Sequence, residues 1–157
     1  MPDSWTLQQW FDAYGESHRH PMNKLIHWIC VPIIAYSIIA LVSLLKFPPP
    51  IDYPVIGNAA SIFVLAAFVF YLRLSVKMAM AMLLFGFVCL WIADMAQDGH
   101  IPLWESALSL FIAAWLGQFY GHKLEGKKPS FLRDIQFLMI GPAWLIGHIF
   151  RKMGWKY

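Results

Sequence analysis

The sequence predicts an all-α integral membrane protein, and three observations support this fold class. First, 59% of the residues are hydrophobic and only 13% are charged, whereas about 25% of the residues of soluble domains are charged. Second, the mean hydropathy of +0.55 excludes a disordered chain, which requires low hydrophobicity and high charge. Third, long apolar stretches recur along the whole chain. Because a length of 157 residues is typical of one domain, residues 1–157 are predicted to form a single membrane-embedded domain.

An amphipathic helix is predicted ahead of the first apolar stretch. Leu7, Trp10, Phe11 and Tyr14 recur at helical spacing and form one apolar stripe. Ser4 is a suitable N-cap for this helix. The helix can lie in the plane of the lipid headgroups or pack on the cytosolic face of the protein itself, and the periodicity leaves both alternatives open.

Four apolar stretches are long enough to cross a bilayer, whose hydrocarbon core requires roughly 20 residues of helix. The four predicted transmembrane helices are Leu25–Leu45, Pro54–Leu72, Val76–Ala93 and Leu103–Tyr120. A fifth stretch, Ile135–Phe150, has 16 residues and contains the pair Gly141-Pro142. A helix of this length covers only about 24 Å, and proline interrupts helices. The fifth stretch is therefore predicted to be a C-terminal re-entrant or interfacial helical segment.

The positive charges predict the orientation of the chain in the membrane. Eight lysine and arginine residues precede the first stretch, join the second to the third or follow the fourth, whereas only Lys46 lies in the segments on the other side. Because such charges are retained in the cytoplasm, a multi-pass protein of a bacterial inner membrane or the endoplasmic reticulum is expected. The cations interrupt apolar runs, which argues against nucleic-acid binding. Cys30 and Cys89 lie in different predicted spans and are not expected to pair.

Histidines gather on the predicted cytoplasmic side of the membrane. The histidines placed there are His18, His20, His27, His122 and His148. Only His100 falls on the opposite side. Imidazole nitrogens with a few oxygen ligands suit zinc, iron, copper or nickel, and ionisable groups at membrane depth indicate function. The pattern predicts either one shared metal site or separate interfacial histidines, each hydrogen-bonded to a carbonyl or a lipid phosphate.

Polar residues accompany two of these histidines at helical spacing. Asn23 lies four residues before His27. Gln118, His122 and Glu125 share one face of a helix if that helix is unbroken. These neighbours are expected to hold the imidazole rings in one tautomer and orientation.

Two stretches around these histidines resemble the motifs of a known family. Residues 14–32 read YGESHRHPMNKLIHWICVP and resemble the motif H-x4-N-x3-H-x4-P, while residues 118–129 read QFYGHKLEGKKP and resemble Q-F-x-G-H-x-x-E-x-x-x-P. The matching residues are His18, Asn23, His27, Pro32, Gln118, Gly121, His122, Glu125 and Pro129. The chain thus resembles the membrane-bound 2-hydroxy fatty acid dioxygenases, a family named for the metabolism of phytosphingosine to odd-numbered fatty acids. It departs from the family pattern at Cys30, at Ser130 and at His148, a position where an acidic residue is expected in many relatives.

The resemblance implies an iron(II)-dependent dioxygenase of lipid metabolism. Such an enzyme uses dioxygen to remove one carbon from a long-chain 2-hydroxy fatty acid, which is an α-oxidation. The iron ligands implied for this chain are His18, His27, His122 and His148. Glu125 is expected to act as a further ligand or as a general base, with Asn23 and Gln118 as supporting catalytic residues.

The same resemblance suggests where the substrate binds. Four cations follow the second motif, namely Lys123, Lys127, Lys128 and Arg133. They are expected to attract the substrate carboxylate to the membrane surface, or they form an ordinary positively charged loop. The acyl tail is expected to lie between the first and the fourth predicted spans, where each buried methylene contributes about 0.8 kcal/mol.

Two other classes of protein are compatible with the same residues. A membrane-embedded zinc hydrolase acting on a lipid would use the same histidines, with a zinc-bound water as nucleophile and Glu125 as base. A lipid-binding or transport protein without catalytic activity would use the histidines as proton or headgroup contacts. The metal that the protein binds distinguishes these alternatives: iron, zinc or none.

Overall fold

Six helices make up the described part of the structure, a computed structural model that describes residues 5–47, 57–126 and 136–157. Their bounds are α1 Leu7–Gly15, α2 Pro21–Ser43, α3 Ala59–Leu72, α4 Val76–Asp98, α5 Leu103–Glu125 and α6 Gln136–Lys152. Within the described ranges, the only β-type pairing is an isolated bridge between Lys46 and Asn58. The predicted all-α class is therefore confirmed.

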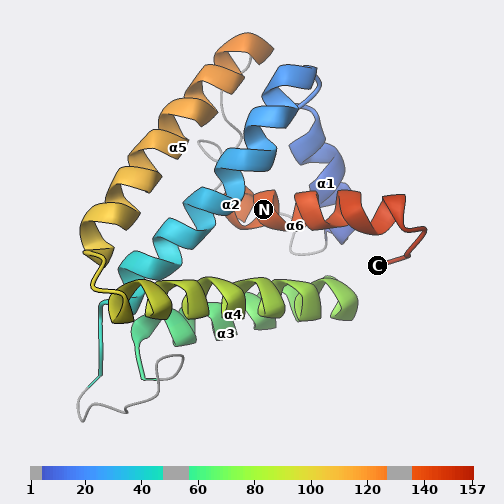
Figure 1. The fold of residues 1–157 in the computed structure, drawn as a ribbon. Coiled ribbons are helices and arrows are strands. Elements are labelled where there is room, and N and C mark those ends of the chain that lie inside the picture. Colours follow the sequence, from blue (N-terminus) through green and yellow to red (C-terminus); the bar gives the residue numbers. More distant parts are fainter. Residues whose placement is uncertain (1–4, 48–56, 127–135) are drawn as a thin grey trace.

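Two antiparallel helix pairs form the framework of the fold (Figure 1). α2 packs against α5, and α3 packs against α4. The two pairs lie close together where α2 ends and α3 begins, and they diverge toward the other end (Figure 1). α6 lies between the diverging pairs and contacts both α2 and α4, while α1 packs on α6. The interior of the molecule is therefore enclosed by α2, the α3/α4 pair and α6.

The N-terminal helix packs on the protein itself. α1 is capped by Thr6, whose hydroxyl accepts a hydrogen bond from the Gln9 N–H at 3.3 Å while the Gln9 side chain accepts one from the Thr6 N–H at 2.7 Å. Ser4, the predicted cap, lies outside the described residues, and the observed cap is this reciprocal pair. All four residues of the predicted apolar stripe are buried. A Cβ added to Gly147 of α6 would lie 2.5 Å from the ring of Phe11, so α1 and α6 are in close contact.

Two helices are long and apolar enough to cross a membrane, and this suggests membrane association. They are α2 and α4, each with 23 residues. α3 has only 14 residues and extends about 21 Å; residues 54–56 of the predicted span lie outside the described ranges. α5 has 23 residues, but polar side chains such as Glu105 and Gln118 lower its hydropathy. By length and composition, two of the four predicted spans are thus found.

The C-terminal segment is one continuous helix. α6 has 17 residues and includes Pro142 in its interior, so the predicted break at Gly141-Pro142 is wrong. Proline removes one helical hydrogen bond, but Gly141 and Pro142 are both buried. A Cβ on Gly141 would lie 3.1 Å from the hydroxyl of Tyr14. Tertiary packing therefore keeps the helix unbroken.

The interface between α2 and α5 is closely packed because two glycines of α5 face α2. A Cβ added to Gly117 would lie 2.7 Å from the Sγ of Cys30, and one added to Gly121 would collide with the Oδ1 of Asn23. An acyl chain therefore has no room between α2 and α5 at Gly117 and Gly121. Cys30 and Cys89 are both buried and free of disulfide bonds, as predicted.

Candidate metal centre

Three histidines meet at the end of the molecule where α2 begins and α5 ends. His18 lies between α1 and α2, His27 in the second turn of α2 and His122 in the last turn of α5. Their side chains are at most 5% exposed, and each offers one ligand nitrogen within 4.8 Å of the others. The ring centroids lie 4.2 Å apart for His18 and His27, 4.9 Å for His27 and His122, and 5.3 Å for His18 and His122. These three residues, the histidine triad, could hold a metal ion.

Hydrogen bonds determine which ring nitrogens of the triad present lone pairs. The Nδ1 of His18 donates to the carbonyl of Tyr14 at 2.5 Å, and the Nδ1 of His27 donates to the carbonyl of Asn23 at 2.9 Å. Because a carbonyl only accepts, each Nδ1 carries the proton and each Nε2 is free to bind a metal. Among the described residues, the Nε2 of His18 and the Nδ1 of His122 are buried without a hydrogen-bond partner. Burial lowers the pKa of His18 to about 4, so its ring is neutral at pH 7, the form that binds metals.

The segment between α1 and α2 holds His18 in place. The His18 N–H donates to the carbonyl of Gly15 at 3.0 Å, and the His18 ring stacks on Tyr14 with centroids 4.1 Å apart and 10° between the ring planes. His20 caps α2, because its Nδ1 accepts a hydrogen bond from the Met22 N–H at 3.2 Å. His20 is thus a helix cap at the protein surface, outside the triad.

Glu125 ties the end of α5 to the start of α2. Its Oε1 accepts a hydrogen bond from the Arg19 N–H at 2.8 Å, and its Oε2 accepts from the His20 N–H at 2.8 Å and from the Nδ2 of Asn23 at 3.0 Å. Three donors stabilise the ionised carboxylate. Both oxygens therefore hold the segment that carries His18.

Asn23 and Gln118 both lie beside the triad, as the spacing predicts. The Nδ2 of Asn23 also donates to the carbonyl of Ser17 at 3.0 Å, so this side chain stabilises the same segment as Glu125. Gln118 is buried one turn before His122 on a helix that continues unbroken to Glu125. The rings of His18 and His27 are oriented by main-chain carbonyls, and not by the amide and carboxylate side chains that were expected to orient them.

His148 lies outside the histidine triad. Its Nδ1 is 2.8 Å from an Arg151 guanidinium nitrogen, and its ring packs on Trp144 and Trp28 with centroids 4.9 Å and 6.3 Å away. Trp144 also contacts His18, with ring centroids 5.6 Å apart. The structure therefore places His148 at the same end of the molecule as the triad, with the ring of Trp144 between His148 and His18.

The predicted substrate-binding cations are described in part. Lys123 is exposed in the last turn of α5, next to His122. Lys127, Lys128 and Arg133 lie outside the described residues.

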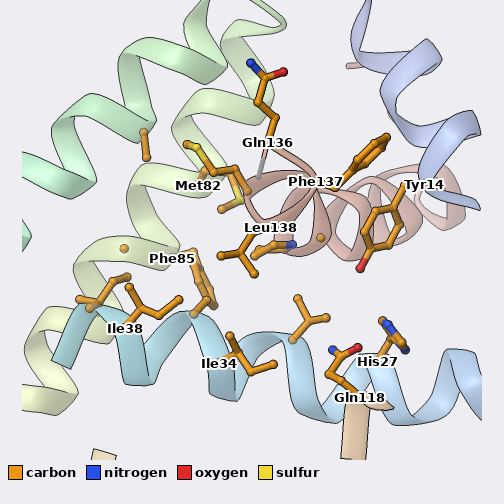
Figure 2. Close-up of a pocket in the computed structure, with 18 of the residues that line it drawn as sticks. Tyr14, His27, Ile34, Ile38, Met82, Phe85, Gln118, Gln136, Phe137 and Leu138 are labelled. Atoms are coloured by element: carbon orange, nitrogen blue, oxygen red, sulfur yellow. The ribbon is translucent and has the colours of Figure 1, made fainter. Parts of the chain in front are cut away.

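A cavity of about 350 Å³ extends from the triad into the interior. His18, His27 and His122 line it together with the polar side chains of Tyr14 and Gln118. The rest of the lining is mostly apolar and comes from α2 to α6; α5 contributes Trp115. Ile34, Ile38, Met82, Phe85 and Leu138 are among these residues (Figure 2). The volume lies within the range of about 300–1,000 Å³ of small-molecule sites. The arrangement suits a molecule with a polar head at the triad and an apolar tail along α2.

The sequence interpretation missed most of this lining. No residue of α3 or α4, and none of α6 besides His148, was assigned to the site, although Tyr71, Met82 and Pro142 all line the cavity. One usable signal was the spacing of Val31, Ile34 and Ile38 after His27, which places them on one helical face.

Comparisons with known proteins match nearly the whole chain. The family model described as Mpo1-like, 2-hydroxy-palmitic acid dioxygenase Mpo1-like, matches residues 5–153. The chain is similar to the 2-hydroxy-palmitic acid dioxygenase MPO1 of Saccharomyces cerevisiae (strain ATCC 204508 / S288c), with 29% identity over 151 residues that cover 94% of this chain and 82% of the yeast protein. No solved structure matches the chain.

Proposed function

Since the chain belongs to the Mpo1-like 2-hydroxy-palmitic acid dioxygenase family, we propose that it is an iron(II)-dependent dioxygenase that shortens long-chain 2-hydroxy fatty acids by one carbon. The observation that carries this proposal is the buried histidine triad at the head of an apolar cavity. The reaction balances if one dioxygen converts the 2-hydroxy acid to the shortened acid, carbon dioxide and water. The whole chain would serve as one catalytic domain.

The donor atoms of the triad fit a first-row transition metal. Two buried nitrogens, on His18 and His122, have no other partner among the described residues, and leaving such groups unsatisfied is costly. Neutral imidazoles suit iron as well as zinc. When bound, iron(II) supplies the redox chemistry that dioxygen requires, which protein side chains alone do not provide.

The remaining residues of the site bind the substrate and orient the ligands. Tyr14 and Asn23 hold the rings of His18 and His27 through their carbonyls. Gln118 lines the cavity beside the triad and is placed to hydrogen-bond the polar head of a 2-hydroxy acid. The apolar lining receives the acyl chain and excludes water. His148 is not included in the proposed ligand set, because its Nδ1 faces Arg151.

The surface cations are proposed to serve substrate capture. Lys123 is exposed at the triad end of α5, and the sequence continues with Lys127, Lys128 and Arg133. A cationic segment at a membrane surface attracts anionic lipids. A fatty acid carboxylate would be drawn toward the cavity in the same way.

Oxygen consumption tests the proposed reaction. The protein purified without oxygen is expected to contain iron, and to take up dioxygen when given 2-hydroxypalmitic acid and iron(II). Palmitic acid, which lacks the hydroxyl, is the matched control and should give no uptake. Stoichiometric zinc without oxygen uptake would point to the hydrolase alternative, and no bound metal without uptake would point to a lipid-binding protein.

The membrane placement is also a proposal, with α2, α3, α4 and α5 as the four crossing helices. Large apolar side chains on each of them face outward: Leu25 is 55% exposed, Leu65 58%, Leu84 64% and Leu116 67%. The buried groups include the polar triad. Soluble proteins rarely expose large contiguous apolar surfaces, whereas helices in lipid do so throughout.

Cysteine labelling tests the proposed orientation, with the triad on the cytoplasmic side. Lys123→Cys lies at the triad end and Asp98→Cys at the opposite end, and both native side chains are exposed. In intact cells a membrane-impermeant maleimide should label Asp98→Cys and leave Lys123→Cys unlabelled. Both should label after lysis. Labelling of Lys123→Cys alone in intact cells would show the opposite orientation. Equal labelling of both variants in intact cells would show that α5 does not cross the membrane.

A further inference from the structure

One face of α2 follows the cavity along most of the helix. The α2 residues that line it are His27, Val31, Ile34, Ala35, Ile38 and Ile39. Their spacing of four, three, one, three and one residues keeps them on the same side of a helix. From His27 to Ile39 the helix advances about 18 Å at 1.5 Å per residue. The cavity is therefore elongated, with His27 of the triad at one end (Figure 2).

A buried apolar cluster lies at the other end of the cavity. This cavity floor consists of Ile39, Ala60, Val64, Cys89 and Leu90, all at most 8% exposed. Two of its members, Ile39 and Val64, line the cavity directly. Gly86 of α4 lies so close to Val64 that an added Cβ would be 2.7 Å from the Cγ1 of Val64. Because α3 and α4 are this close, a chain entering from the triad cannot pass between α3 and α4 at the floor.

We propose that the cavity floor sets the longest acyl chain that this protein accepts, with Val64 and Ile39 as the residues that meet its terminal methyl group. The inference rests on the proposed function, since it assumes that the carboxyl and 2-hydroxyl groups bind at the triad. A zigzag hydrocarbon advances about 1.25 Å per carbon, given C–C bonds of about 1.5 Å at roughly 111°. The distance of about 18 Å along α2 then holds about 14 carbons beyond the two polar ones.

Ala67 provides the decisive substitution, because it lines the cavity one helical turn from Val64. A larger side chain at this position should stop the acyl chain one turn early, which removes about 5 Å or about four methylenes. Ala66 is the matched control, since it lies on the same helix, is exposed and does not line the cavity. The variants are Ala67→Leu and Ala66→Leu.

The measurement is the affinity of the full-length protein for a homologous series of saturated 2-hydroxy acids, determined by calorimetry without oxygen so that no acid is consumed. The affinity of the unmodified protein should rise about fourfold per methylene, which corresponds to about 0.8 kcal/mol, until the chain reaches the floor and then stop rising. In Ala67→Leu this limit should come about four methylenes earlier, which makes the binding of the longest acids about two-hundredfold weaker. Ala66→Leu should behave as the unmodified protein.

A second pair of variants shifts the limit in the opposite direction. Val64→Ala removes two methyl groups from the floor and should let the limit move outward by about two carbons. Val69→Ala is its control, because Val69 is 46% exposed on the same helix. This pair keeps the proposal testable if Ala67→Leu does not fold.

The outcomes separate this inference from the dioxygenase proposal. A limit that moves inward in Ala67→Leu or outward in Val64→Ala supports the inference, even if no oxygen uptake is found. Oxygen uptake with an unchanged length limit in the folded lining variants overturns the inference and leaves the dioxygenase proposal intact. Affinity that keeps rising with chain length in the unmodified protein overturns it as well.

Discussion

Replacing His27 or His122 with alanine is expected to abolish oxygen uptake and to prevent the proposed binding of iron. Each substitution removes one of three buried imidazoles whose ligand nitrogens lie within 4.8 Å of one another. Substitution of an outer partner of a metal ligand typically costs 10- to 100-fold in affinity or activity. Loss of a ligand itself should exceed the upper end of that range, so activity should fall by more than about a hundredfold. Metal analysis and oxygen consumption measure the two effects.

His100 provides the control for this prediction. It is exposed and has a φ of 59°, a backbone conformation that asparagine tolerates better than alanine does. His100→Asn should therefore retain both iron and activity. An unchanged helical circular dichroism spectrum would show that His27→Ala and His122→Ala are folded. Full oxygen uptake by these folded variants would show that the triad is not the site of catalysis.

The meeting of the triad was predictable because it depends on topology. Antiparallel spans bring the residues before the first span and after the fourth to the same side, and helical spacing places His27 and His122 among polar partners. The observed hydrogen bonds between Glu125 and the amides of Arg19 and His20 confirm that these distant segments lie together.

The cavity was not predictable from the same patterns. α2 carries apolar residues all around its circumference, so hydrophobicity alone does not distinguish Ile34, which is buried, from Ile29, which is 57% exposed. Close contacts between helices determine which side of α2 is buried. These contacts depend on glycines such as Gly117 and Gly86, and the sequence does not show which helix each glycine faces. For this reason the helical pattern does not reveal which residues of α3, α4 and α6 line the cavity together with α2 and α5.

The C-terminal segment shows a second limit of sequence patterns. Pro142 is a strong helix breaker by propensity, yet it lies in the interior of a continuous helix. The surrounding packing against α1 and α2 outweighs the local preference. His148 was grouped with the other histidines because it lies on the same side, but its ring position depends on Trp144 and Arg151, which topology alone does not place.

Glu125→Ala is expected to lower the affinity for iron about 10- to 100-fold, the range for residues that orient metal ligands. The substitution leaves the amides of Arg19 and His20 and the Nδ2 of Asn23 without their acceptor. Each intramolecular hydrogen bond contributes about 0.5–1.5 kcal/mol to the free energy of unfolding, so the protein should also be less stable to heat. The segment that carries His18 would lose its connection to α5, and high iron(II) concentrations should therefore restore much of the activity.

Glu125→Gln separates this positioning role from the two roles suggested by the motif. The amide retains one accepting oxygen, so its iron affinity should lie between those of the native protein and Glu125→Ala. A general base would behave differently, because glutamine and alanine would then be equally inactive while iron binding stayed normal at every concentration. A direct ligand would give equal loss of iron in both variants. Iron titrations that follow bound metal and oxygen uptake in parallel therefore distinguish three roles of Glu125: a residue that positions the His18 segment, a general base and a metal ligand.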